Sequence, residues 1–170
     1  NMLCSLILVF NRKLQTNDLQ IISELKNPSG RLEKIFDKKS IRAFIDYAHS
    51  PDAISKVLSS LKKITSGKLI LVFGCGGDRD YKKRPKMGKI VSSKCNKIYV
   101  TDDNPRNENP EKIRTVIIKN IRNKNCFNIG SRSKAIKTAI QNAEPNEVIL
   151  VAGKGHEGTQ IYKNKTLNTS

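Results

Sequence analysis

Apolar and polar residues alternate in blocks along the chain, and these blocks predict strands and helices in turn. Short, largely apolar runs predict strands at residues 41–46, 68–73, 97–101, 126–129 and 147–152. Between them, apolar residues at helical spacing predict a helix that begins at Ser50-Pro51-Asp52 and helices over 85–94, 110–122 and 131–143. The alternation indicates an α/β, Rossmann-like fold, with a mostly parallel sheet and helices on both faces.

The two ends of the chain depart from this alternation. Residues 2–26 have a helical pattern, and the turn Asn27-Pro28-Ser29-Gly30 after them marks a domain boundary. Residues 160–162 and 164–166 are expected to add an edge hairpin. The first ten residues are apolar, but they are too few to span a bilayer and lack the features of a signal peptide. No membrane partner is expected.

Composition argues against two further classes of function. The net charge of +17 favours nucleic acid or another anionic surface, but the lysines are scattered, and a chain with 5% aromatic residues and no Trp has little with which to stack bases. We therefore expect no nucleic acid partner. The four cysteines lie far apart without a CxxC pair, which predicts reduced thiols in a cytoplasmic protein rather than a zinc site.

Polar clusters follow four of the predicted strands at the point where each strand ends. The clusters are DYAH at 46–49, GCGGDR at 74–79, DDNPR at 102–106 and GKGHE at 153–157. Because the carboxyl ends of parallel strands meet at one edge of a sheet, where ligands of such sheets gather, all four clusters should lie along one rim.

The charges on this rim match a small zwitterion. Arg79 and Arg106 can each clamp a carboxylate through paired donors, whereas Asp103 and Glu157 can accept ammonium groups. Asn104 can donate or accept a hydrogen bond. A diamino-dicarboxylic acid would use all of these groups.

Plainer interpretations of the same residues stay open. The glycine loop can be a tight turn that needs glycine dihedrals, or it can allow Arg79 to reach inward; it fits neither G-x-G-x-x-G nor a P-loop. Arg106 can pair with Glu108 on the surface instead of binding a ligand, and Asp103 can cap the turn at Pro105. His49 can meet a phosphate or cap the next helix.

Six ordered motifs together resemble the C-terminal domain of the Mur ligases, and are most similar to the type that adds meso-diaminopimelate. They are GRLE (30–33), DYAHSPDAI (46–54), VFGCGGDRD (72–80), KRPKMG (83–88), VTDDNPR (100–106) and VAGKGHE (151–157). The resemblance implies two parts: residues 1–27 as the helical tail of a central ATPase domain, and residues 28–170 as an amino-acid-binding domain truncated at its end.

The resemblance also implies an activity. The parent protein would be an ATP-dependent amide ligase that joins meso-2,6-diaminopimelate to UDP-MurNAc-L-Ala-D-Glu in peptidoglycan precursor synthesis. ATP and Mg²⁺ would be held mainly by the central domain, whose P-loop, Mg²⁺ ligands and carbamylated lysine are absent here, so this piece is expected not to turn over alone. The alternative is a non-catalytic amino-acid or nucleotide-binding Rossmann-like module, whose oligomeric state the sequence does not fix.

Site residues follow from the matched motifs. Arg106 would hold the far carboxylate that lysine lacks, and Asp46 would face the ribose of the nucleotide. No catalytic or metal-ligating residue is expected in this chain. The implied diaminopimelate site is Arg79, Asp103, Asn104, Pro105, Arg106, Gly153 and Glu157, and the implied nucleotide contacts are Arg31, Asp46 and His49.

Overall fold

A six-stranded sheet forms the centre of the computed structural model, which describes residues 8, 15, 28–38 and 40–168. The strand order is β1-β2-β6-β3-β4-β5, and every neighbouring pair except β1 with β2 is parallel. The predicted α/β, mostly parallel fold is therefore confirmed. The strands are β1 (Glu33–Lys38), β2 (Ile41–Asp46), β3 (Leu69–Phe73), β4 (Lys97–Val100), β5 (Cys126–Asn128) and β6 (Val148–Ala152). The predicted helical region at 2–26 lies outside the described residues, apart from residues 8 and 15.

The antiparallel edge strand β1 was not predicted from the sequence. Its residues, EKIFDK, mix charged and apolar side chains, and none of the six is fully buried. The pairing with β2 is also irregular between Lys34 and Phe36. A charged and irregular strand is typical of a sheet edge, where one side of the backbone faces solvent, but it lacks the apolar run that identified the inner strands.

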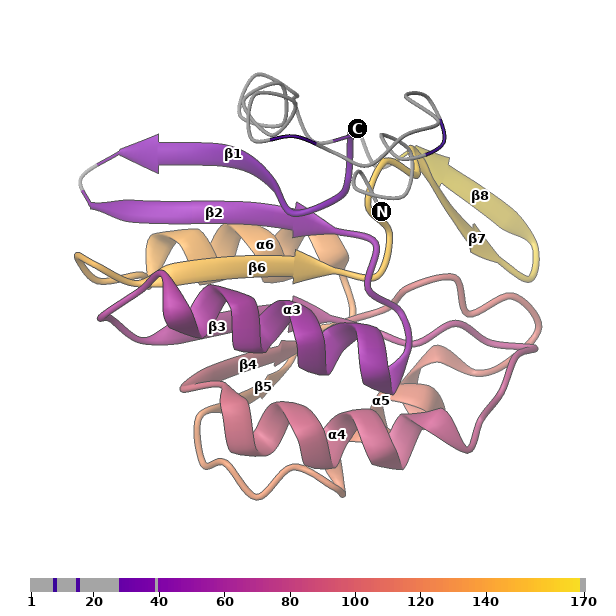
Figure 1. Cartoon of the computed structure of the whole chain (residues 1–170). Helices are drawn as coiled ribbons and strands as arrows, with labels where there is room; N and C mark the ends of the chain where they lie inside the picture. Colours follow the sequence, from indigo (N-terminus) through magenta and orange to yellow (C-terminus); the bar gives the residue numbers. More distant parts are fainter. Residues whose placement is uncertain (1–7, 9–14, 16–27, 39, 169–170) are drawn as a thin grey trace.

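Helices cover both faces of the sheet, as predicted. Figure 1 shows α3 (Pro51–Lys63) and α4 (Lys83–Lys94) in front of the sheet, and α6 (Arg132–Gln141) behind it. Helix α5 (Pro110–Ile118) packs beside α4 and shares the front layer's core through Ile113 and Ile117. The central strands β3 and β6 are buried along their whole length between the two layers, which explains their continuous apolar sequences.

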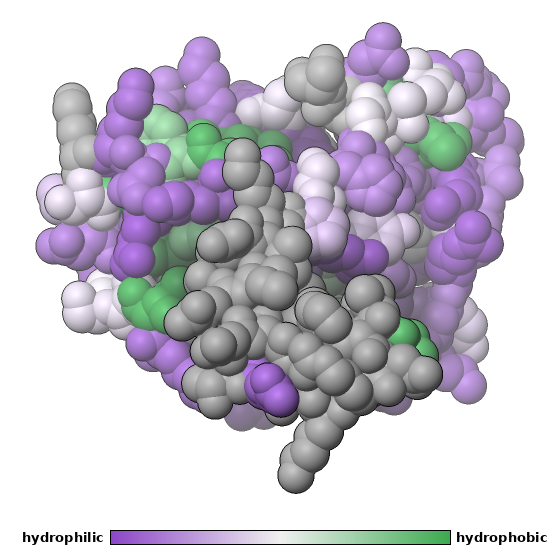
Figure 2. Space-filling model, turned by 45° about the horizontal axis from the view of Figure 1, so that its top comes forward, coloured by the Kyte–Doolittle hydropathy of each residue, from purple (hydrophilic) through white to green (hydrophobic). Residues whose placement is uncertain are grey.

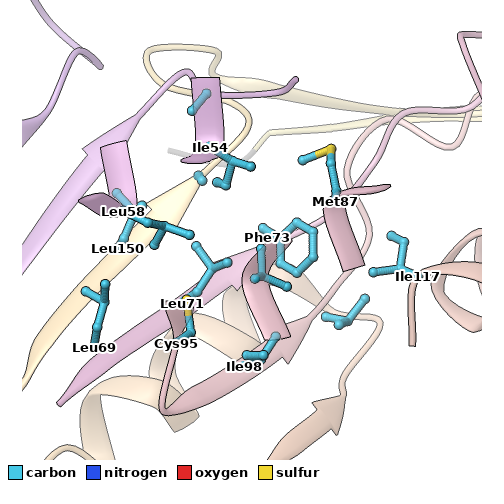
Figure 3. Close-up of a cluster of buried hydrophobic side chains, with 14 of the residues drawn as sticks. Ile54, Leu58, Leu69, Leu71, Phe73, Met87, Cys95, Ile98, Ile117 and Leu150 are labelled. Carbon is cyan, nitrogen blue, oxygen red and sulfur yellow. The ribbon is translucent and has the colours of Figure 1, made fainter. Parts of the chain in front are cut away.

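The larger core lies between the sheet and α3, α4 and α5. Leu71 and Phe73 of β3 meet Ile54 and Leu58 of α3 and Met87 of α4 there (Figure 3). A smaller cluster on the opposite face joins β2, β3, β4 and β6 to two alanines of α6. This packing fixes the strand ends, and therefore the loops of the rim.

Side-chain caps start three of the helices just after the rim loops. Ser50 accepts a hydrogen bond from the Ala53 N–H at the start of α3, so Ser50 caps this helix and not His49. Asn109 caps α5, and Ser131 caps α6, in the same way. The loops thus pass directly from a buried strand into a capped helix, which restricts their conformations.

The C-terminal hairpin forms a sheet of its own. Strands β7 (Thr159–Tyr162) and β8 (Lys165–Asn168) pair with each other, and an isolated bridge joins Tyr162 to Arg106, so the expected edge hairpin forms but does not extend the central sheet. Its backbone bonds instead to the 102–106 loop, with Arg106 N–H donating to Ile161 O at 3.1 Å. The hairpin therefore stands over the end of the sheet where β2 and β6 finish (Figure 1).

The surface agrees with the scattered charge of the sequence. Among the residues coloured by hydropathy, Figure 2 shows mostly hydrophilic ones, interrupted by small apolar patches. Within the described ranges, no helix is long and apolar enough to cross a bilayer.

Candidate ligand site at the sheet rim

Four loops meet at the carboxyl ends of β2, β3, β4 and β6, as the sequence predicts. Gly153 N–H donates to Asp46 O at 3.0 Å, which joins the loops after β6 and β2. Gly77 N–H donates to Asn104 O at 2.8 Å, which joins the loops after β3 and β4. The convergence arises because these four strands are neighbours in the order β2-β6-β3-β4.

The glycine loop gives the 102–106 loop room for close approach. A methyl group added to Gly77 would overlap the carbonyl of Pro105, which is buried. Gly76 and Gly77 do not have positive φ angles, so a tight turn that needs glycine dihedrals is the wrong interpretation of this pair. Their role in the structure is to let two backbones touch.

Arg106 lies across the glycine loop, in a left-handed conformation with φ 52°. Its guanidinium donates to Gly77 O at 2.8 Å and to Asn104 O at 3.3 Å. The surface pair of Arg106 with Glu108 does not form, because Glu108 accepts two hydrogen bonds of 2.8 Å from buried Arg84. Arg106 is therefore held at the rim by backbone carbonyls.

Arg79 is exposed, and the described residues provide no polar partner for its side chain. Its side chain stays at the surface but passes near Arg106, because a methyl group added to Gly76 would lie 4.0 Å from Arg79 Cγ and 3.0 Å from Arg106 Nη1. Its assignment to the ligand site stays a prediction.

Asn104 is the centre of a buried polar network that the sequence only partly indicated. Its Oδ1 accepts from Lys154 Nζ at 3.0 Å and from Ile161 N–H at 2.9 Å, and its Nδ2 donates to Glu157 Oε2 at 3.2 Å. Lys154 Nζ also donates to Glu157 Oε2 at 3.2 Å and lies 4.0 Å from Asp103 Oδ1. Asp103, Asn104 and Glu157 are thus brought together as predicted.

Lys154 was not among the predicted site residues. It is 3% exposed, and its ammonium group lies beside the carboxylates of Asp103 and Glu157. From the sequence, these two carboxylates were expected to bind ammonium groups of a ligand. A signal was available, because Lys154 belongs to the motif GKGHE directly after β6. Its burial was not apparent from the sequence, since lysines are rarely buried without partners.

The carboxyl group of Glu157 is kept ionised by this network. Burial raises its pKa, but hydrogen bonds from Lys154 and Asn104 and the charge of Lys154 outweigh that effect and hold the pKa below its ordinary value. A negatively charged Glu157 is the form that can hold an ammonium group at neutral pH.

A groove of about 830 Å³ opens beside this network, between α6, the ends of β2 and β6, and the hairpin. Arg132 and Gln160, each less than 10% exposed, contribute to its lining. Arg132 donates to Ala152 O at 2.9 Å, but its other terminal nitrogen and Gln160 Nε2 have no hydrogen-bond partner among the described residues. Arg132 was not predicted as a site residue from the sequence. A signal was available, because Arg132 comes shortly after the predicted strand 126–129, as the other rim residues come after theirs.

The predicted nucleotide contacts gather around Tyr47, which follows β2 and lies close to Gly155 of the neighbouring 153–157 loop. The Arg31 guanidinium lies 4.7 Å from the Tyr47 ring centroid, and His49 and His156 lie 4.8 and 6.1 Å from it. Asp46 is buried, and its two oxygens accept from the N–H groups of Leu32 and Ala48. Tyr47 belongs to the motif DYAHSPDAI, but no role was predicted for it from the sequence.

The two neighbouring acids at the end of β4 have different surroundings. Asp102 accepts from the Tyr162 hydroxyl at 2.9 Å and pairs with Arg114, so it anchors the hairpin and α5. Asp103 faces Gly153 and Lys154 instead. Only the second acid is therefore placed beside the network of Asn104 and Glu157.

The rim and its sheet define an α/β domain that gathers charged and amide side chains at the carboxyl ends of parallel strands. Residues 30–155 match the family model described as Mur ligase, glutamate ligase domain, so this chain belongs to the Mur ligase family.

Among curated relatives, the UDP-N-acetylmuramoyl-L-alanyl-D-glutamate–2,6-diaminopimelate ligase of Rickettsia bellii is 46% identical over 145 residues, covering 84% of this chain and 30% of the relative. The ligase of the same name from Prochlorococcus marinus is 41% identical over 177 residues, covering 99% of this chain and 34% of the relative. The chain thus spans about a third of the length of these relatives.

Solved structures agree with the family assignment. A structure of a ligase with the same name has a TM-score of 0.78 and 34% identity, covering 97% of this chain and 34% of that chain. The folylpolyglutamate synthase of Mycobacterium tuberculosis, solved with ADP and AMPPCP, has a TM-score of 0.67 at 19% identity, covering 89% of this chain and 35% of that chain. The second likeness extends to the fold alone.

Proposed function

We propose that this chain is the amino-acid-binding part of an ATP-dependent ligase that adds meso-2,6-diaminopimelate to UDP-MurNAc-L-Ala-D-Glu, a step of peptidoglycan precursor synthesis. The parent enzyme acts in the cytoplasm on these small-molecule substrates. In this proposal residues 28–170 form the amino-acid-binding domain, and residues 1–27 belong to a preceding ATPase domain. The names of the relatives at 41–47% identity support the proposal.

The observation that carries the proposal is the junction of the 102–106 and 153–157 loops. Asn104 and Glu157, 53 residues apart, meet at 3.2 Å, and Asp103 and Gly153 lie against each other beside them. Arg106 is fixed at the neighbouring glycine loop by Gly77 O. Two cations, Arg106 and Lys154, and two carboxylates, Asp103 and Glu157, lie within a single rim, which fits an amino acid that carries both carboxylate and ammonium groups.

In the proposed binding mode, Arg106 holds the far carboxylate of diaminopimelate, and Asp103 and Glu157 receive an ammonium group. Pro105 stiffens the loop that presents Arg106, and Arg79 comes from the exposed side of the glycine loop. Because L-lysine lacks the far carboxylate, it leaves the Arg106 guanidinium without an anionic partner. The site therefore selects diaminopimelate over lysine.

The residues around Tyr47 suit one side of a nucleotide. Arg31 and His49 offer positive or hydrogen-bonding groups beside the ring of Tyr47, and the buried carboxylate of Asp46 fixes the backbone on either side of them through the N–H groups of Leu32 and Ala48. ATP, when bound, supplies the activation of a substrate carboxylate for amide formation. In this proposal ATP and Mg²⁺ are held mainly by the preceding ATPase domain of the parent protein.

Calorimetric titration of the 170-residue chain with meso-diaminopimelate and with L-lysine tests the proposal. We expect binding of diaminopimelate and no comparable binding of lysine. Arg106→Ala should weaken diaminopimelate binding by about 2 to 5 kcal/mol, the usual cost of losing one desolvated charge contact. Arg122→Ala, which removes an exposed arginine outside the rim loops, is the matched control and should leave the affinity unchanged.

Equal binding of both amino acids would refute the selecting role of Arg106. Absence of diaminopimelate binding would refute the proposed amino-acid site in this chain. A separate assay with ATP and both substrates should detect no tripeptide formation by the chain alone. Turnover in this assay would contradict the proposal that the reaction needs the preceding ATPase domain.

A further inference from the structure

Lys154 is buried at the junction of the rim loops and the hairpin. Its ammonium donates to Asn104 Oδ1, Glu157 Oε2 and the backbone oxygen of Thr159. An ammonium group has three protons, so these three acceptors use its full donor capacity. Lys154 therefore has no proton left for a bound ligand and acts on a ligand only through its neighbours.

The acceptor side of the Asn104 amide is also fully used. Oδ1 has two lone pairs, and it receives Lys154 Nζ at 3.0 Å and Ile161 N–H at 2.9 Å. Both partners are donors, so the opposite orientation of the amide would set its NH₂ group against an ammonium and an N–H. The charge of Lys154 makes that flipped orientation especially unfavourable, because a buried donor without an acceptor is costly.

The consequence concerns what Asn104 can offer to a ligand. One N–H of Nδ2 is bonded to Glu157 Oε2, and within the described residues no partner is recorded for the second N–H. With its oxygen committed, Asn104 is restricted to donating. A group that only donates recognises a carboxylate or carbonyl oxygen and rejects an ammonium group.

We propose that Lys154 is a positioning residue that locks Asn104 as a hydrogen-bond donor, so that this side chain binds a carboxylate of the amino-acid substrate. The recognition step rests on the proposed function, whereas the locking step concerns only the ligand-free protein. The same ammonium keeps Glu157 ionised and directed towards Asn104, which places a donor and an anion side by side.

Hydrogen exchange in the ligand-free chain tests the locking step. Lys154→Met keeps an unbranched side chain of similar length but removes all three donors. We expect the Ile161 N–H, which bonds to Asn104 Oδ1, to exchange at least about tenfold faster in Lys154→Met, as expected for the loss of a network coupling. Lys134→Met, which removes an exposed lysine of α6, is the matched control and should leave this rate unchanged.

A double-mutant cycle on diaminopimelate binding tests the recognition step. Lys154→Met and Asn104→Ala should each weaken binding by about tenfold, and the double variant should be no weaker than the weaker single variant, because both changes remove the same interaction. The preference for diaminopimelate over L-lysine should also fall in Lys154→Met, since the Asn104 amide then loses one of the three contacts that fix its orientation.

Different failures have different meanings. Unchanged exchange at Ile161 in a folded Lys154→Met chain would overturn the locking role, and additive losses in the cycle would overturn action through Asn104. If Lys154→Met does not fold, Lys154→Arg is measured in its place. Because arginine keeps the positive charge and the donors, we expect slow exchange at Ile161 and an unchanged preference for diaminopimelate. Slow exchange at Ile161 together with loss of that preference would overturn the proposal. Failure of the wild-type chain to bind diaminopimelate would overturn the proposed function and the recognition step, while the exchange rates would still decide the locking step.

Discussion

Replacing Gly77 by alanine should separate the glycine loop from the 102–106 loop. An alanine methyl group at this position would overlap the Pro105 carbonyl, which is backbone and cannot rotate away. The loops must then move apart, which breaks the 2.8 Å bond from Gly77 N–H to Asn104 O and the 2.8 Å bond from Arg106 to Gly77 O. Both bonds position residues of the proposed ligand site.

The cost of Gly77→Ala can be worked from these two bonds. A neutral backbone hydrogen bond contributes about 0.5 to 1.5 kcal/mol and a bond from a charged donor about 1.5 to 3 kcal/mol. The free energy of unfolding should therefore fall by about 2 to 4.5 kcal/mol, and the melting temperature by roughly 4 to 18 °C for a chain of this size. Urea unfolding followed by circular dichroism measures the first quantity, and a thermal scan the second.

Gly158→Ala is the matched control, because a methyl group there meets nothing within 4 Å. It should change stability by less than about 0.5 kcal/mol, as expected for a substitution away from any packed feature. The reasoning is refuted if Gly77→Ala is as stable as Gly158→Ala. In that case the close approach of the two loops does not hold the rim together.

Three further predictions concern the rest of the domain. Glu108→Gln should destabilise the chain near neutral pH by about 1 to 3 kcal/mol, towards the lower value because Glu108 is partly exposed. The hydrogen bonds from Arg84 outweigh burial and hold the pKa of Glu108 in the folded chain below its ordinary 4.5. The stabilisation is therefore complete above pH 4.5 and is lost as the pH falls through the lower pKa of the folded chain. The unfolding free energies of Glu108→Gln and the unchanged chain, measured by urea titration, should converge in acid, and a constant difference would contradict the pairing. Burial raises the pKa of Cys75 and Cys95 to about 12, so both thiols should react with iodoacetamide far more slowly in the native chain than after unfolding, and equal rates would show that they are accessible. Leu71→Ala, in the fully buried strand β3, should cost about 2 to 5 kcal/mol of unfolding free energy, and a loss below 1 kcal/mol would mean that the core is not packed there.

The pattern of apolar residues was sufficient for the inner part of the fold. Strands β3 and β6 are continuous apolar runs because both of their faces are covered, and the helices between the strands show their buried faces at helical spacing. These signals are local, so they can be read over a few residues. The prediction of one rim followed from them, because parallel strands place their ends on the same side of a sheet.

The boundaries and the edges of the sheet were less visible. Helix α5 ends at Ile118, four residues before the predicted end at 122, and the next residues form a short turn through Asn120 and Ile121. The edge strand β1 was missed because it is stabilised by pairing with β2 and not by burial of an apolar face. The hairpin β7-β8 was expected, but its attachment to the 102–106 loop depends on backbone bonds that leave no trace in residue type.

The α/β fold, the order of its main elements and the loops that carry the candidate site follow from the amino-acid pattern, since periodicity and the direction of parallel strands fix these features. How the side chains at the rim are used depends on the folded arrangement. In the folded chain, Arg106 is hydrogen-bonded to the glycine loop, and Asp102 is paired with Tyr162 and Arg114. Lys154 is buried between Asn104 and Glu157. The physical reason is distance along the chain: Lys154 and Asn104 are 50 residues apart, and their contact depends on neighbouring strands and a covering hairpin that no local pattern contains.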